Sequence, residues 1–74
     1  MTRRYGIKVK NHVGTWYVLS ERQTPIGRLY LVESELHGDE APCLWIDSAC
    51  RVILEDVWNG AEDLEEYFES RGIK

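Results

Sequence analysis

Two cysteines and two histidines are the side chains of this 74-residue chain best suited to metal binding or nucleophilic chemistry. Structural zinc sites hold the metal with close ligand pairs, typically separated by about two to four residues. Cys43 and Cys50 have six residues between them, and His12 and His37 lie far upstream. Because the chain offers no close pair, we expect no metal site and no cofactor.

The two cysteines are better explained as small apolar residues than as nucleophiles. Cys43 begins the apolar run 43–46, where burial would leave its thiol unreactive. Cys50 lies in a predicted turn beside Arg51. Covalent catalysis needs a nucleophile next to a base that a third group orients, and neither cysteine has such a context. Two cysteines in so short a chain also fit a reducing compartment, so we expect a cytoplasmic protein.

Groups of neighbouring acidic residues are the other candidates for catalysis, as general acids or bases. His37 with Asp39 and Glu40 could act as an acid–base cluster, although Gly-Asp pairs are also common in turns. Glu55 and Asp56 are adjacent in a predicted strand, so their carboxylates should point to opposite faces. The sequence contains no glycine-rich phosphate loop and no nucleophile elbow. We therefore expect no catalytic residues and no enzyme activity.

Charge is distributed unevenly along the chain. Residues 1–32 carry six Lys or Arg and one acid, a balance of +5, whereas residues 33–74 carry twelve acids and three bases, a balance of −9. Together they give the net charge of −4 at pH 7. Such asymmetry is typical of two contact surfaces, of a match between basic strands and an acidic helix, or of two ordinary solvated faces.

The basic half is a candidate nucleic-acid surface, with Tyr5 or Trp16 able to stack on bases. Its candidate contacts are Arg3, Arg4, Lys8, Lys10, Arg22 and Arg28. A sequence pI near 5.0 argues against this function, because nucleic-acid-binding domains are usually strongly basic. Nucleic-acid binding is therefore the alternative function.

The acidic half makes protein binding the main hypothesis. The candidate partner contacts are Trp58 and the acidic face of a predicted helix, which carries Glu62, Asp63, Glu65, Glu66 and Glu69. We expect Trp58 to fill the corner between the last strand and this helix; if exposed, it would anchor a partner. The predicted function is a non-catalytic protein-interaction or accessory module, with an acidic nucleic-acid mimic or inhibitor as a further alternative.

The elements that must position these residues are five strands and one helix. Alternation of apolar and polar residues predicts a strand over 5–10, and runs rich in β-branched and aromatic residues predict others. The expected strands are 5–10, 15–19, 28–33, 43–46 and 51–57, with a loop over 20–27. The wholly apolar run 43–46 fits a central strand covered on both faces. The sequence predicts an α+β fold, in which a small antiparallel sheet carries one C-terminal helix.

The helix is expected over residues 60–71. Asn59 or Gly60 can cap its start, and Gly72 can end it. Its apolar residues at helical spacing predict one buried face. The expected core comprises Ile7, Val9, Trp16, Val18, Leu29, Leu31, Leu44, Ile46, Val52, Leu54, Leu64, Tyr67 and Phe68.

Length and composition indicate one domain spanning residues 1–74. No apolar run approaches the roughly 20 residues that a membrane helix needs, so no membrane partner is expected. A chain this short buries only about 60% of the surface that its unfolded form exposes, so its stability should be modest. A homodimer would be one way to add stability.

A resemblance covers about half of the chain. It runs through Leu29-Tyr30-Leu31-Val32-Glu33-Ser34-Glu35, Gly38-Asp39-Glu40-Ala41-Pro42-Cys43-Leu44, Asp47 and Leu54-Glu55-Asp56-Val57-Trp58-Asn59-Gly60. These segments are similar to small uncharacterised proteins and accessory domains of bacterial, mainly clostridial, mobile elements. The resemblance implies an origin on a bacterial plasmid, phage or conjugative element, and it assigns no functional residues.

Overall fold

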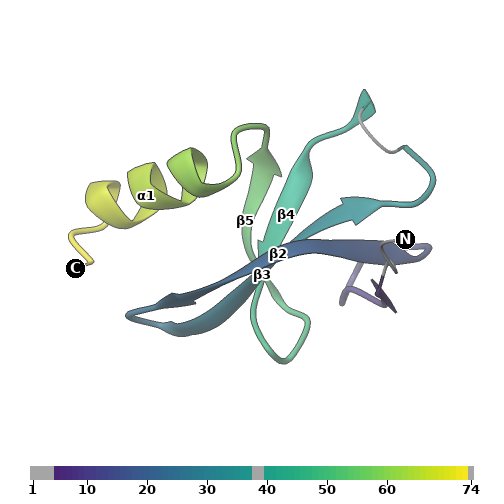
Figure 1. The fold of residues 1–74 in the computed structure, drawn as a ribbon, viewed down its shortest axis with the longest axis horizontal. Helices are drawn as coiled ribbons and strands as arrows, with labels where there is room; N and C mark the ends of the chain where they lie inside the picture. The colour runs from purple at the N-terminus through teal and green to yellow at the C-terminus, as the bar shows by residue number, and fades with distance from the viewer. Residues whose placement is uncertain (1–4, 38–39, 74) are drawn as a thin grey trace.

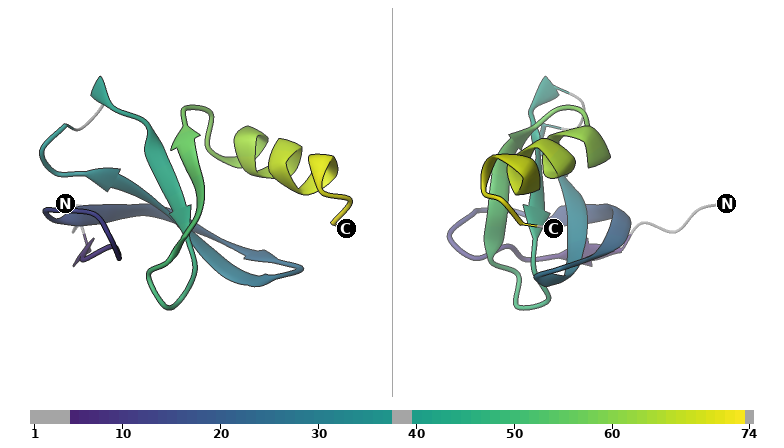
Figure 2. Two further views of the ribbon diagram at one scale, coloured as in Figure 1. Left: turned by 180° about the vertical axis from the view of Figure 1, so that it is seen from behind. Right: turned by 90° about the vertical axis from the view of Figure 1, so that its left-hand side faces the viewer.

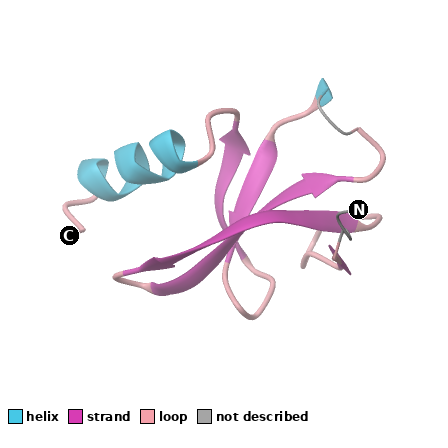
Figure 3. Ribbon diagram, in the orientation of Figure 1, coloured by secondary structure: helices cyan, strands magenta, loops and turns pink. Residues whose placement is uncertain are grey.

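The computed structural model describes residues 5–37 and 40–73, and within them it contains five strands and one α-helix (Figures 1 and 3). The strands are β1 (Gly6–Ile7), β2 (Trp16–Thr24), β3 (Gly27–Ser34), β4 (Cys43–Ile46) and β5 (Val52–Val57), followed by α1 (Ala61–Ser70). They form one antiparallel sheet in the order β1-β2-β3-β4-β5. The predicted α+β fold, a small antiparallel sheet with one C-terminal helix, is confirmed.

The β2–β3 hairpin is longer than the sequence suggested. A loop was expected over residues 20–27, but β2 continues to Thr24 and only Pro25 and Ile26 separate it from Gly27 in β3. The Thr24 hydroxyl donates to the Gly27 carbonyl and accepts the Ile26 N–H, while Gly27 adopts a φ of 111°. A polar strand with one turn at its tip therefore replaces the expected loop.

The first strand is shorter than the predicted range 5–10. Only Gly6 and Ile7 pair with β2. Beyond Ile7 the chain leaves β2, because Val9 is buried against the sheet and the Lys10 N–H donates to the Cys50 carbonyl at 3.0 Å. The segment after β1 thus crosses one face of the sheet instead of extending it.

The two faces of β4 support two separate cores. On one face Leu44 and Ile46 pack with Val9, Trp16 and Val32. On the other face, Trp45 packs with Leu29, Val57 and Leu64 of α1. Figure 2 shows the helix along one side of the twisted sheet. The predicted coverage of residues 43–46 on both faces is confirmed.

The buried core differs in part from the expected one. Val32, Trp45 and Val57 are buried but are absent from the expected core. Val32 packs with Leu44 and Ile46 on one face of the sheet, whereas Trp45 and Val57 pack with Leu64 on the other. Several expected core residues lie at the edges of the two cores and are only partly buried: Ile7, Val18, Leu31, Val52, Leu54, Tyr67 and Phe68.

The ends of α1 follow local backbone chemistry. Gly60 precedes the helix with φ 48° and ψ −113°, a conformation that favours glycine, and no side chain caps the first turn. At the other end Gly72 takes a φ of 68°, and the N–H groups of Gly72 and Ile73 donate to the carbonyls of Glu69 and Phe68. This is a Schellman ending, with Gly72 as the predicted terminator.

Candidate functional site

A hollow of about 390 Å³ lies between α1 and the end of β5. We call it the α1–β5 groove, and it is lined by Leu54, Glu55, Asp56, Trp58, Asn59, Asp63, Glu66, Tyr67 and Ser70. Three of the six predicted partner-contact residues line it, namely Trp58, Asp63 and Glu66. The groove therefore combines an aromatic wall with four carboxylates.

Trp58 is exposed, which corrects the expectation that it fills the strand–helix corner. Its exposed fraction is 62%, the largest among the three tryptophans. Trp45 occupies the corner instead, where its indole Nε1 donates to the Gly60 carbonyl at 3.0 Å. Because Trp45 closes the corner, the Trp58 ring remains available at the rim of the groove.

The Asp63 carboxylate holds the backbone segment that precedes the helix. Its Oδ2 accepts the N–H of Asn59 at 3.0 Å and the N–H of Trp58 at 2.8 Å. These backbone donors, Asn59 foremost, hold the pKa of the Asp63 carboxyl below its usual value. The carboxylate thus fixes the backbone that presents Trp58, a positioning role that differs from the predicted direct contact.

Glu55 and Asp56 line the same groove, although the sequence suggested that they point apart. The β4–β5 register shifts between Cys43 and Trp45, so both acids lie opposite one residue of β4. Asp56 has a φ of 58°, outside the conformation of a regular strand. This β-bulge breaks the alternation of side chains and brings both carboxylates to one site.

The remaining acids of α1 have different surroundings. Glu65 Oε1 forms a 3.4 Å ion pair with Arg22 of β2. Glu69 borders a second hollow beyond the helix, together with Glu65 and Phe68. Glu62 is exposed in the first turn, where its N–H donates to the Asn59 carbonyl. The helix therefore presents its acids to several sides, and only Glu66 and Asp63 face the groove.

The predicted nucleic-acid contacts that the structure describes have different surroundings. Arg22 pairs with Glu65, and Arg28 pairs with Glu21 at 2.9 Å. Lys8 donates to the Thr15 hydroxyl, while Lys10 borders a different hollow. Arg3 and Arg4 lie outside the described residues.

The two residues that were predicted to stack on bases, Trp16 and Tyr5, differ in their exposure to solvent. Trp16 is buried, its Nε1 donates to the Val13 carbonyl, and its ring makes an edge contact with His12. It cannot stack on a base without leaving the core. Tyr5 is exposed, so one of the two predicted stacking side chains is accessible.

Cys43 and Cys50 lie on different faces of the sheet. Cys50 borders the core of Val9 and Trp16, whereas Cys43 borders the core of Trp45. Within residues 5–37 and 40–73, no three His, Cys, Asp or Glu side chains are grouped to hold a metal ion. The part of the chain that the structure describes contains no helix long and apolar enough to cross a membrane.

Comparison with known protein families finds a match over nearly the whole chain. The family model of Large polyvalent protein-associated domain 18 matches residues 2–73, which is nearly the whole chain. No curated protein and no solved structure matches.

Proposed function

Because this chain belongs to the family of large polyvalent protein-associated domain 18, we propose that it is a non-catalytic accessory module that binds another protein through the α1–β5 groove. The family description associates the domain with large polyvalent proteins. An accessory domain of such proteins can act by holding a partner and needs no chemistry of its own.

The exposed Trp58 is the observation that supports this proposal most. The Trp58 side chain is 62% exposed, and the contact of so large an apolar ring with water is unfavourable in the free protein. Tryptophan is also among the residues that contribute most to the binding energy of protein interfaces. The backbone that carries this ring is held in place, because Asp63 accepts hydrogen bonds from the N–H groups of both Trp58 and Asn59. A partner would therefore meet a side chain on a positioned backbone.

The charges around Trp58 indicate which kinds of residue a partner segment needs in order to bind there. Glu55, Asp56 and Glu66 line the groove, and none of the Lys and Arg residues that the structure describes does so. A partner segment with Lys or Arg near an apolar residue matches both the carboxylates and the indole. Arg also stacks on aromatic rings, so the same side chain could contact Trp58.

Affinity capture with variants of the groove tests this function. We expect partners captured by the wild type to be lost with Trp58→Ala and with Glu55→Lys plus Glu66→Lys. Glu35→Lys plus Glu40→Lys is the control, since it makes the same total charge change at exposed positions outside the groove. Purified partners should then bind in a titration at moderate salt. Retention of every partner by the groove variants, or turnover of a small molecule by the pure protein, would contradict the proposal.

A further inference from the structure

The outer edge of β2 is open beyond its short pairing with β1. Gly6 and Ile7 of β1 pair only with Tyr17 and Trp16, and the Tyr5 carbonyl accepts the Val18 N–H at 3.0 Å. From Ser20 to Thr24 the structure assigns no described strand to this side of β2. This second half of β2 therefore exposes one edge of the sheet.

The register of the hairpin determines which backbone groups point outward. Thr24 and Gly27 flank the two-residue turn, so they form the closing pair that exchanges hydrogen bonds across the hairpin. Pairs alternate along an antiparallel ladder, so Arg22 and Ser20 also face β3, while Gln23 and Glu21 face away from it. The outward N–H of Val18, beyond the bulge at Leu19, agrees with this alternation. Within residues 5–37 and 40–73, no strand pairs with the outward N–H and carbonyl groups of Glu21 and Gln23, so these groups can pair with an added strand.

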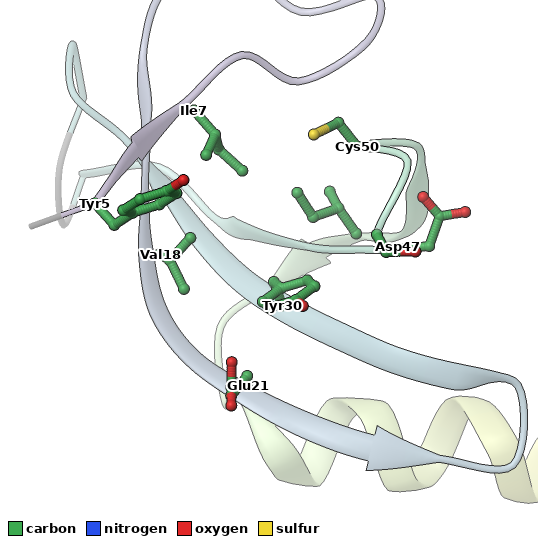
Figure 4. A pocket seen from close by; sticks show the side chains of 9 residues that line it. Tyr5, Ile7, Val18, Glu21, Tyr30, Asp47 and Cys50 are labelled. Atoms are coloured by element: carbon green, nitrogen blue, oxygen red, sulfur yellow. The ribbon is translucent and has the colours of Figure 1, made fainter.

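A hollow of about 530 Å³ lies directly beside this edge, on the face of the sheet opposite α1 (Figure 4). Tyr5, Val18 and Tyr30 contribute to its apolar part, while Glu21 and Asp47 supply carboxylates. These two carboxylates form exposed ion pairs with Arg28 at 2.9 Å and Arg51 at 3.8 Å, but none of the described Lys or Arg residues lines the hollow itself. A side chain with an apolar stem and a positive end matches this lining, because the stem can lie on the tyrosines and the charge can approach the carboxylates.

We propose that an extended basic segment of a partner protein adds to the sheet along residues 20–24 of β2 and places a Lys or Arg side chain in the hollow between Tyr5 and Tyr30. Main-chain hydrogen bonds to Glu21 and Gln23 provide the pairing, and the hollow selects the side chain. This surface goes beyond the α1–β5 groove and lies on the other face of the sheet, so each can be tested without the other.

A second copy of this chain fits the edge poorly. Two β2 edges paired antiparallel about a two-fold axis would place Glu21 opposite Glu21 or Arg22 opposite Arg22, and like charges in these positions are destabilising. An axis at Gln23 would place Glu21 opposite Pro25, which has no N–H to donate. A heterologous segment avoids these conflicts, because its residues opposite Glu21 can be basic.

The test is a titration followed residue by residue with ¹⁵N-labelled protein. The probe is an N-acetylated, C-amidated hexapeptide, Val-Lys-Val-Lys-Val-Thr, and the matched peptide carries Glu in place of both Lys. We expect the Lys peptide to shift the amide signals of Glu21 and Gln23 and the ring signals of Tyr5 and Tyr30. Amide exchange at Glu21 and Gln23 should slow when the peptide is saturating. The Glu peptide should leave these signals unchanged.

Two variants and one control separate the edge from the hollow. Glu21→Gln should weaken binding about threefold, because it removes an exposed charge. Gln23→Pro should weaken it about tenfold or more, because proline removes the outward donor and is tolerated on edge strands. Glu65→Gln makes the same charge change as Glu21→Gln on the helix side and should leave binding unchanged.

Four results would overturn the proposal. The first is a set of peptide shifts confined to Trp58 and its neighbours, and the second is equal binding of the Glu peptide. The third is the absence of shifts at millimolar peptide in a protein whose other signals show a folded sheet. The fourth is slow exchange of the Glu21 and Gln23 amides in the free protein, whether in a dimer or a monomer, since the edge would then already be covered.

Discussion

Replacing Leu64 with alanine should remove a large part of the stability of the domain. Leu64 is the one residue of α1 that is fully buried, at 0% exposure, and it packs with Leu29, Trp45 and Val57. Truncating a buried leucine costs about 2–5 kcal/mol, through lost burial and the cavity that remains. A domain of this length has a free energy of unfolding of about 4–11 kcal/mol, at roughly 0.05–0.15 kcal/mol per residue. We therefore expect Leu64→Ala to remove about half of it.

Urea denaturation, followed by tryptophan fluorescence and far-ultraviolet circular dichroism, measures this loss. Phe68→Ala should cost less than Leu64→Ala, because Phe68 lies at the edge of the same core and is only partly buried. Val13→Ala is the control; Val13 is 84% exposed, so its replacement should change stability by less than about 0.5 kcal/mol. If Leu64→Ala does not fold, Leu64→Met should still fold, with a loss below about 1.5 kcal/mol. A Leu64→Ala midpoint equal to that of the wild type would refute the docking of α1 through this residue.

Three further experiments test the backbone that precedes α1 and the contact between β2 and α1. The pKa of Asp63 is lowered from its ordinary value of 3.8, so the ionised carboxylate stabilises the folded protein above about pH 4. This stabilisation is lost as the pH falls through the lowered pKa. Thermal melts of Asp63→Asn should therefore depend less on acid pH than those of the wild type. Gly60→Ala should cost about 1–3 kcal/mol in urea denaturation, from backbone strain alone, because the added Cβ would meet Leu31 Cδ2 at an ordinary 3.6 Å. A double-mutant cycle of Arg22→Gln and Glu65→Gln should give a coupling below about 1 kcal/mol, since both side chains of this 3.4 Å pair are well exposed.

The fold could be predicted where local pattern and tertiary environment agree. The apolar run 43–46 was placed as a central strand, and Gly72 ends the helix by the predicted backbone chemistry. The β2–β3 hairpin could not be bounded in the same way. Its strand 20–24 is polar, and its pairing depends on the two-residue turn at Pro25 and Ile26, which resembles a loop in composition.

The groove could be predicted only in part, because two of its features arise from backbone irregularities. Period-two alternation assigns Glu55 and Asp56 to opposite faces, and only the bulge with Asp56 at φ 58° brings them together. Likewise, nothing in the sequence shows which tryptophan fills the helix corner. The bond from Trp45 Nε1 to the Gly60 carbonyl decides this and leaves Trp58 exposed.

Among the residues that the structure describes, one ion pair joins the two oppositely charged halves of the chain. Arg22 with Glu65 joins a base of the first 32 residues to an acid of the remainder, whereas Arg28–Glu21 and Arg51–Asp47 each lie within one half. Four acids of residues 33–74, Glu55, Asp56, Asp63 and Glu66, line the α1–β5 groove that Trp58 borders. A basic partner would place its positive charge among these carboxylates as it binds. Binding at the groove should for this reason weaken steeply as salt is raised, whereas the Trp58 contribution should persist, because screening reduces charge attraction and leaves apolar burial unchanged.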